Sequence, residues 1–149
     1  MSDYTPVFLP GEKVSLTLTA NCKGGDLMVV TGQNAVAPFT PSGTPAENYV
    51  GVASADQNSG LRVGVYCRGQ VHESLADGTV TAGDQITTAQ NANRQVKTLA
   101  VTAQDVTGTP TQGTINTAIN GAVNGARSVI GIALTTAADN QKVRWMAIN

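Results

Sequence analysis

The residues best suited to chemistry form one short run, His72-Glu73-Ser74. A histidine, a carboxylate and a hydroxyl are the components of a hydrolase triad, and His72 is the single histidine of the chain. Neighbouring residues on a strand point to opposite faces, so these three cannot act on one atom without a bend. The sequence also lacks the Gly-x-Ser-x-Gly elbow of a hydrolase. We therefore expect a solvated strand end before the turn at 76–78, and no catalytic residue.

Metal-binding and redox chemistry would fall to the cysteines, Cys22 and Cys67, which form no Cys-x-x-Cys motif. A small secreted chain usually carries more cysteines. We expect two reduced, half-buried thiols, and a disulfide between them is the alternative. No glycine-rich loop has the sequence of a phosphate cradle. The sequence predicts no metal, no cofactor and no small-molecule substrate.

The acidic residues stand apart from one another instead of forming pairs. Most of them lie next to Gly, Asn or Gln, residue types that favour turns. A carboxylate in such a place accepts hydrogen bonds from nearby backbone N–H groups. We interpret the following as turn formers, not as catalytic acids: Asp56, Asp77, Asp84, Asp105 and Asp139.

Charge is scarce in this chain. Only 13% of its 149 residues are charged, against about 25% in a typical protein, and the net charge is −1. This argues against nucleic acid and against an anionic membrane surface as partners. We see no secretory signal and no apolar run of the ~20 residues that a membrane helix needs. We expect a soluble protein made in a cytosol, with a neutral surface suited to contact with other proteins.

Strand patterns dominate the sequence. Apolar and polar residues alternate with period two over 14–19, 61–68 and 142–148, and 27–31 is a short apolar strand. Over 114–127, apolar residues instead recur at three- and four-residue spacing, which predicts a short helix. A loop with two Asn-Gly turns is the competing interpretation of that stretch.

Short motifs recur along the chain and indicate an internal repeat. Val50-Gly-Val-Ala53 is matched by Ile130-Gly-Ile-Ala133, and Gly25-Asp26 is matched by Gly83-Asp84. The sequence predicts an all-β fold, a small barrel or sandwich of two related β-units with one short helix. The expected organisation is an extended arm at 1–12 and a single β-rich domain at 13–149, with repeat units at 25–68 and 83–148 and an insertion at 99–127.

Tyr66 and Trp145 lie on strands that the repeat makes equivalent. Large aromatic side chains dominate the packing of cores and interfaces. We therefore expect these two residues to pack in the core or in an oligomer interface.

Several motifs stand in the order found in the capsid decoration (cement) proteins of tailed bacteriophages. They are the Gly-Val-Ala strand at 51–53, the Ala-Gly-Asp turn at 82–84 and the closing strands within 130–145. The chain resembles this family over 25–149. The resemblance implies a non-enzymatic virion protein, assembled in the host cytoplasm onto the outer surface of the head as trimers between capsomers. Its partners would be the major capsid protein and other copies of itself.

The arm at 1–12 carries two prolines, which disfavour pairing within the chain. It also carries four apolar side chains that are costly to leave in water. By the resemblance, the arm contacts the capsid or a neighbouring copy through these residues: Tyr4, Val7, Phe8 and Leu9.

Two other functional classes fit a small β protein. One is a tail or fibre accessory domain or a carbohydrate-binding module, which calls for exposed aromatic residues or paired carboxylates in one groove. Aromatic residues make up only 4% of the chain. The other is a small enzyme, which would depend on His72.

Overall fold

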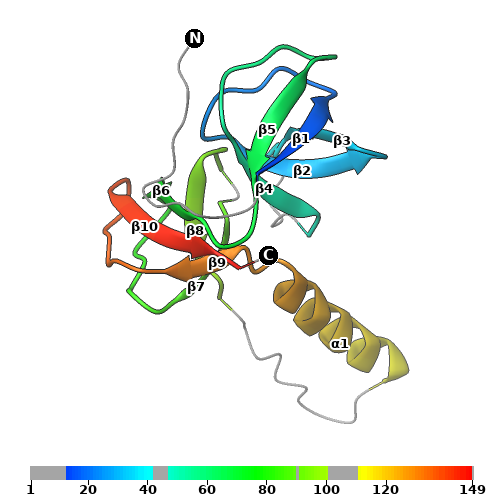
Figure 1. Cartoon of the computed structure of the whole chain (residues 1–149). Coiled ribbons are helices and arrows are strands. Elements are labelled where there is room, and N and C mark those ends of the chain that lie inside the picture. Colours follow the sequence, from blue (N-terminus) through cyan, green and yellow to red (C-terminus); the bar gives the residue numbers. More distant parts are fainter. Residues whose placement is uncertain (1–12, 42–46, 90, 101–110, 149) are drawn as a thin grey trace.

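The structure, a computed structural model, describes residues 13–41, 47–89, 91–100 and 111–148. These residues form two closed five-stranded β-barrels and one helix (Figure 1). The predicted fold class, mainly β with two related units and one helix, is confirmed. The units are barrels and not the layers of a sandwich. The predicted arm lies outside the described residues.

The first barrel is built from the N-terminal half of the chain. Its spatial order is β1-β3-β2-β4-β5, and it closes because β1 pairs with both β3 and β5. Its strands are β1 (Lys13–Leu18), β2 (Leu27–Gly32), β3 (Ala35–Pro38), β4 (Tyr49–Ala53) and β5 (Arg62–Tyr66).

The second barrel has the equivalent order, β10-β6-β8-β7-β9. The helix α1 (Gln112–Arg127) lies between β8 and β9 in the chain, so the loop reading of that stretch is wrong. The strands are β6 (Val71–Ala76), β7 (Gln85–Thr88), β8 (Gln95–Thr98), β9 (Gly131–Ala133) and β10 (Lys142–Ala147).

Strand registers are equivalent in the two barrels as well. Leu18 pairs with Val36 in the parallel β1·β3 ladder, and Ala76 pairs with Val96 in the parallel β6·β8 ladder. A closed barrel leaves no unpaired strand edge, so neither unit offers an edge for strand addition.

The recurring Gly in the Gly-x-Ala motif has a steric cause. A Cβ at Gly51 would meet the backbone oxygen of Tyr66, and a Cβ at Gly131 would meet the backbone oxygen of Met146. In each barrel the neighbouring strand therefore approaches the glycine too closely for any side chain. The motif marks the same backbone contact twice.

The recurring Gly-Asp motif is a turn. Gly25 and Gly83 have φ angles of 89° and 95°, which glycine adopts without strain. The following carboxylates close the turn: Asp26 accepts from the Lys23 N–H at 2.8 Å, and Asp84 accepts from the Thr81 N–H at 2.9 Å.

Side chains from both barrels share one hydrophobic core. Leu27, Phe39 and Val52 of the first barrel belong to the same buried cluster as Ile86 and Trp145 of the second. A separate cluster fills the interior of the first barrel, around Leu18, Met28 and Val65. The barrels are therefore packed against each other by apolar burial and not merely joined by the chain.

Candidate functional site

His72 is buried at the junction of the two barrels. Its exposed fraction is 0%, and burial lowers the pKa of its imidazole from 6.5 to about 4. The expected solvated strand end is therefore wrong at this residue. The reason is that His72 lies on the inward face of β6, opposite the buried Trp145 of β10. A buried imidazole that is neutral at pH 7 serves packing here.

The two residues after His72 make separate contacts. Glu73 points to the outer face of β6, where its carboxylate lies 2.7 Å from the Lys142 ammonium and 3.6 Å from Arg144 Nε. Ser74 Oγ accepts a hydrogen bond from Trp145 Nε1 at 3.0 Å. His72 and Ser74 thus contact the indole of Trp145 on one face of β6, whereas Glu73 pairs with Lys142 and Arg144 on the other face.

Four rings form a row across the junction, which we call the aromatic row: Tyr66, His72, Trp145 and Tyr49. Successive centroids are 6.4 Å, 5.0 Å and 6.5 Å apart. Tyr49 and Tyr66 come from the first barrel, and the other two come from the second. The structure therefore places both Tyr66 and Trp145 at the contact between the barrels.

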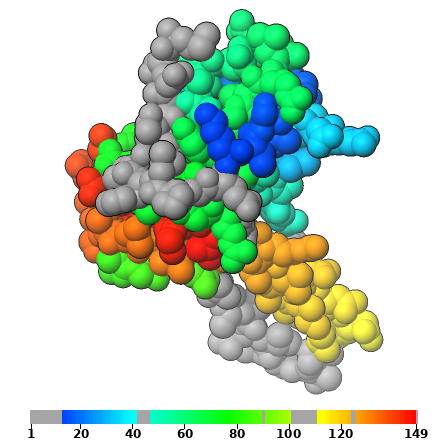
Figure 2. Space-filling model, viewed as in Figure 1, coloured from blue at the N-terminus to red at the C-terminus, as the bar shows by residue number. Residues whose placement is uncertain are grey.

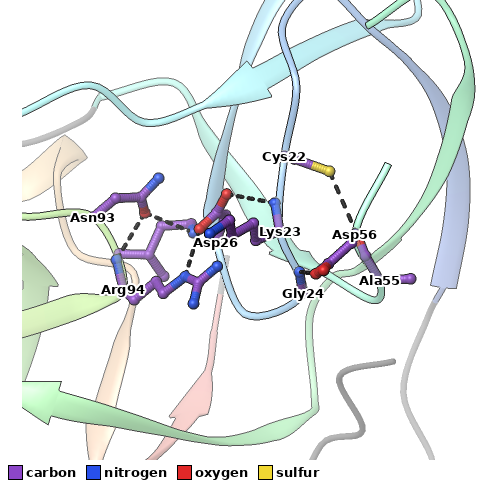
Figure 3. Close-up of polar contacts among 9 residues, drawn as sticks. Cys22, Lys23, Gly24, Asp26, Ala55, Asp56, Asn93 and Arg94 are labelled. Atoms are coloured by element: carbon purple, nitrogen blue, oxygen red, sulfur yellow. Dashed lines mark hydrogen bonds and ion pairs between the residues drawn. The ribbon is translucent and has the colours of Figure 1, made fainter. Parts of the chain in front are cut away.

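Polar contacts, which we call the polar latch, also join the two barrels (Figure 3). Arg94 Nε is 2.7 Å from Asp26 Oδ1, and Asn93 Oδ1 accepts from the Leu27 N–H at 2.9 Å. Both contacts run from the β7–β8 turn of the second barrel to the start of β2 in the first. They fix the relative orientation of the barrels through directional bonds, which apolar packing alone does not provide.

Sequence reasoning missed this latch, because the backbone conformation that sets Arg94 apart is not visible in the sequence. Asn34 and Arg94 occupy equivalent turns and have similar positive φ angles, 54° and 67°. Arginine is an uncommon residue in that conformation. The difference between the two copies marks the position where the second barrel reaches the first.

Other carboxylates mostly support turns. Asp56 accepts from the Gly24 N–H and Asp139 accepts from the Gly78 N–H, each at 2.8 Å. Asp84 accepts hydrogen bonds from the Thr81 N–H at 2.9 Å and from the Thr98 hydroxyl at 2.8 Å. These two bonds hold the pKa of the Asp84 carboxyl below its usual value. Within the described residues, no group of three His, Cys, Asp or Glu side chains is placed to hold a metal ion.

The two cysteine sulfurs lie near backbone carbonyls. Cys22 is buried, and its thiol donates to the carbonyl of Ala55 at 3.5 Å; burial raises its pKa. Cys67 is half-buried and donates to the carbonyl of Val65 at 3.6 Å.

The first barrel carries two surface hollows. One, of about 510 Å³, lies among polar turns around Cys22 and Asp56. The other, of about 320 Å³, is apolar and is lined in part by Val14, Leu16 and Val30.

The second barrel carries larger side chains at the place equivalent to the apolar hollow of the first barrel. Val14 pairs with Val65 in the first barrel, and His72 pairs with Trp145 at the equivalent place in the second. Val14 is 40% exposed, whereas the His72 and Trp145 side chains are buried. The His72 and Trp145 rings fill the second barrel at the place where, in the first barrel, the smaller Val14 lines the apolar hollow.

One face of α1 carries three exposed apolar side chains. Ile115, Ile119 and Val123 are exposed by 40%, 56% and 48%. Figure 2 shows α1 projecting from the body of the molecule. Exposed apolar surface that lies together, not as scattered residues, marks a place of contact with another molecule. We name this face the α1 stripe: Ile115, Ala118, Ile119, Ala122, Val123 and Ala126.

The four arm residues that we expected to contact the capsid or a neighbouring copy lie outside the described residues: Tyr4, Val7, Phe8 and Leu9. In the part of the chain that is described, no helix has the length and apolar character needed to cross a membrane.

No family model and no curated protein matches the chain. Among solved structures, the chain is similar to the head fibre gp8.5 N base of bacteriophage phi29. The identity is 16%, and the match covers 91% of this chain and 92% of that chain with a TM-score of 0.49.

Proposed function

We propose that this protein is a structural component of a phage virion. It binds the outer surface of an assembled capsid and stabilises it as a decoration protein, in trimers at positions between capsomers. Its partners are the major capsid protein and its own copies. It performs no catalysis and uses no cofactor. It reaches the exterior of the particle after synthesis in the host cytoplasm.

The capsid role in this proposal follows the resemblance of the motifs at 51–53, 82–84 and 130–145 to decoration proteins, and the α1 stripe supports contact with another molecule. A protein that acts alone has little reason to leave three β-branched apolar side chains in water on a projecting helix. The low charge of the chain supports the same conclusion, because a surface with few charges can be buried without stranding them.

The junction between the barrels also suits a structural role. The aromatic row and the polar latch hold two rigid units in one relative orientation. Binding by a rigid body loses less conformational entropy than binding by a flexible one. Many modest contacts repeated over a capsid then add up through high effective concentration.

The arm supplies a further contact in this proposal. Its apolar residues, Tyr4, Val7, Phe8 and Leu9, would pack against the capsid or a neighbouring copy. Replacing Phe8 and Leu9 by serine would then weaken capsid binding and leave the two barrels folded.

The test is co-sedimentation of the purified protein with expanded, undecorated phage heads. The proposal predicts saturable binding with a fixed number of copies per head. It also predicts that His72→Gln binds as well as the unaltered chain, because His72 is a packing residue. If the protein stays in the supernatant with every such head that is tried, the proposal fails. If His72→Gln keeps its fold but loses binding, a role in chemistry would have to replace the structural one.

A further inference from the structure

We infer that α1 is the surface through which copies of this chain bind one another, with three α1 helices packed in parallel and their stripes facing inward. The inference deepens the proposed function. It takes from that function only the premise that copies of the chain act together, and it assigns the contact to a particular helix.

The spacing of the α1 stripe suits packing between identical helices. At about 100° per residue, its six residues fall within an arc of about 140°, while Asn120 falls on the other side of the helix. Ile115, Ile119, Ala122 and Ala126 follow each other at intervals of four, three and four residues, as the core positions of a heptad do. A heptad stripe is complementary to another copy of itself.

Within its own chain α1 has little support. Every α1 side chain that the structure describes is exposed, except that of Ala118, which is half-buried. No strand in the described part of the chain packs along the helix.

The composition of α1 makes this lack of support costly. Gly113, Gly121 and Gly125 lie within its 16 residues, and glycine is among the poorest helix formers. Most helices in proteins are stabilised by packing an apolar face. A helix with this composition therefore needs a partner along its stripe.

The charge of α1 points to its own copies as that partner. Residues 112–126 carry no charged side chain, and Arg127 stands at the C-terminal end. Identical helices in parallel bring each residue beside its own copies, so any charge on the stripe would repel itself. A stripe without charged side chains avoids this repulsion along its length.

The area that α1 can bury favours three copies over two. A 16-residue helix is about 24 Å long and about 10 Å wide. A side-by-side pair then buries roughly 500 Å², below the roughly 1,200–2,000 Å² of a stable interface. In a bundle of three, each helix touches two neighbours, so each chain buries about twice the area that it buries in a pair. Isoleucine at both kinds of core position also favours more than two strands.

The attachment of α1 leaves room for this arrangement. The helix ends at Arg127, and β9 begins at Gly131. Ser128 and Ile130 in the short connection are buried, so the C-terminal end of α1 is held against the second barrel. Because the helix projects outward from that end (Figure 1), three parallel helices place their barrels around one end of the bundle.

The experiment is sedimentation velocity of the full chain over about 1–100 µM. The variant is Ile119→Asp, which puts a charge in the stripe, and the matched control is Asn120→Asp, which puts the same charge on the opposite face. We expect the unaltered chain and N120D to sediment with three times the 15.3 kDa chain mass, and I119D to sediment as a single chain. Unchanged fluorescence of the buried Trp145 shows that the barrels of I119D are folded.

Three results would overturn the inference: an unaltered chain that is monomeric or dimeric throughout this range, a trimer that survives I119D, or a trimer lost equally in N120D. Head binding separates this inference from the proposed function. A trimer that binds no head leaves the α1 contact standing without the decoration role. A monomeric chain that binds heads leaves the decoration role standing without the α1 contact.

Discussion

Trp145 on β10 lies directly opposite His72 on β6, with ring centroids 5.0 Å apart. Both side chains are fully buried, and the indole N–H of Trp145 is satisfied by Ser74 Oγ. The pair fills the second barrel at the place where Val14 and Val65 pair in the first. The second barrel therefore contributes large rings at this place, and they pack in the core that the two barrels share.

Stability should depend on the protonation of His72. The unfolded chain binds a proton on this imidazole as the pH falls through 6.5, whereas burial delays protonation of the folded protein to about pH 4. The free energy of unfolding is therefore fully retained above pH 6.5 and falls as the pH drops from 6.5 towards 4. We expect a loss of about 2–3 kcal/mol between pH 7.5 and 4.5, measured by urea unfolding followed through Trp145 fluorescence.

His72→Gln is the control for this effect, because glutamine has a similar size and no titrating group in this range. The variant should lose most of the pH dependence between 7.5 and 4.5. If H72Q and the unaltered chain lose the same stability over this interval, the histidine is not the group responsible.

The latch between the barrels should show measurable coupling. In a double-mutant cycle, the Asp26–Arg94 pair is expected to contribute about 0.5–1 kcal/mol, because the Arg94 side chain is 44% exposed and solvent weakens the attraction. About 1 M salt should reduce the coupling. The free energies come from urea unfolding of the single and double alanine variants.

A second ion pair serves as the comparison for the latch. Glu73 and Lys142 lie on neighbouring strands of one barrel, and the Lys142 side chain is 72% exposed. Their coupling should be the weaker of the two. Equal coupling for both pairs would contradict a special role for Asp26 and Arg94 at the junction.

The repeated glycine in the Gly-x-Ala motif should tolerate no side chain. In Gly131→Ala the new Cβ would meet the Met146 carbonyl and the Trp145 ring. We expect a loss of at least about 2 kcal/mol of unfolding free energy, seen as a lower melting temperature by calorimetry. Gly32→Ala is the matched variant, because its nearest contact is Ala35 Cβ at 3.8 Å, and its effect should stay within about 0.5 kcal/mol. A stable G131A protein would show that the strands can separate at this point.

Much of the fold could be predicted because strands and helices leave local, periodic patterns of apolar residues in the sequence. Period-two alternation located β1, β5 and β10 within two residues of their observed ends, and three- and four-residue spacing located α1. The Gly-Asp and Gly-x-Ala motifs were informative because each marks a backbone contact that both barrels need. Such requirements leave the same residue types at equivalent places in the sequence.

The environment of His72 could not be predicted in this way. Its burial depends on Trp145, which is distant in sequence, and on Tyr66 from the other barrel. The latch has the same character. Asp26 closes a local turn, as Asp84 does in the other barrel, and only the distant Arg94 makes Asp26 part of a contact between the barrels. Long-range pairings leave no periodic signal in a single sequence.

The central claim is that this protein stabilises a capsid, and the most direct test is the melting of phage heads. Expanded, undecorated heads would be heated with and without saturating protein, and the temperature at which they lose their packaged DNA would be recorded by dye fluorescence. We expect the heads to lose their DNA at a higher temperature when the protein is bound. The increase should be smaller with I119D, because this variant loses the α1 contact. If saturating bound protein leaves this temperature unchanged, the protein does not stabilise the capsid.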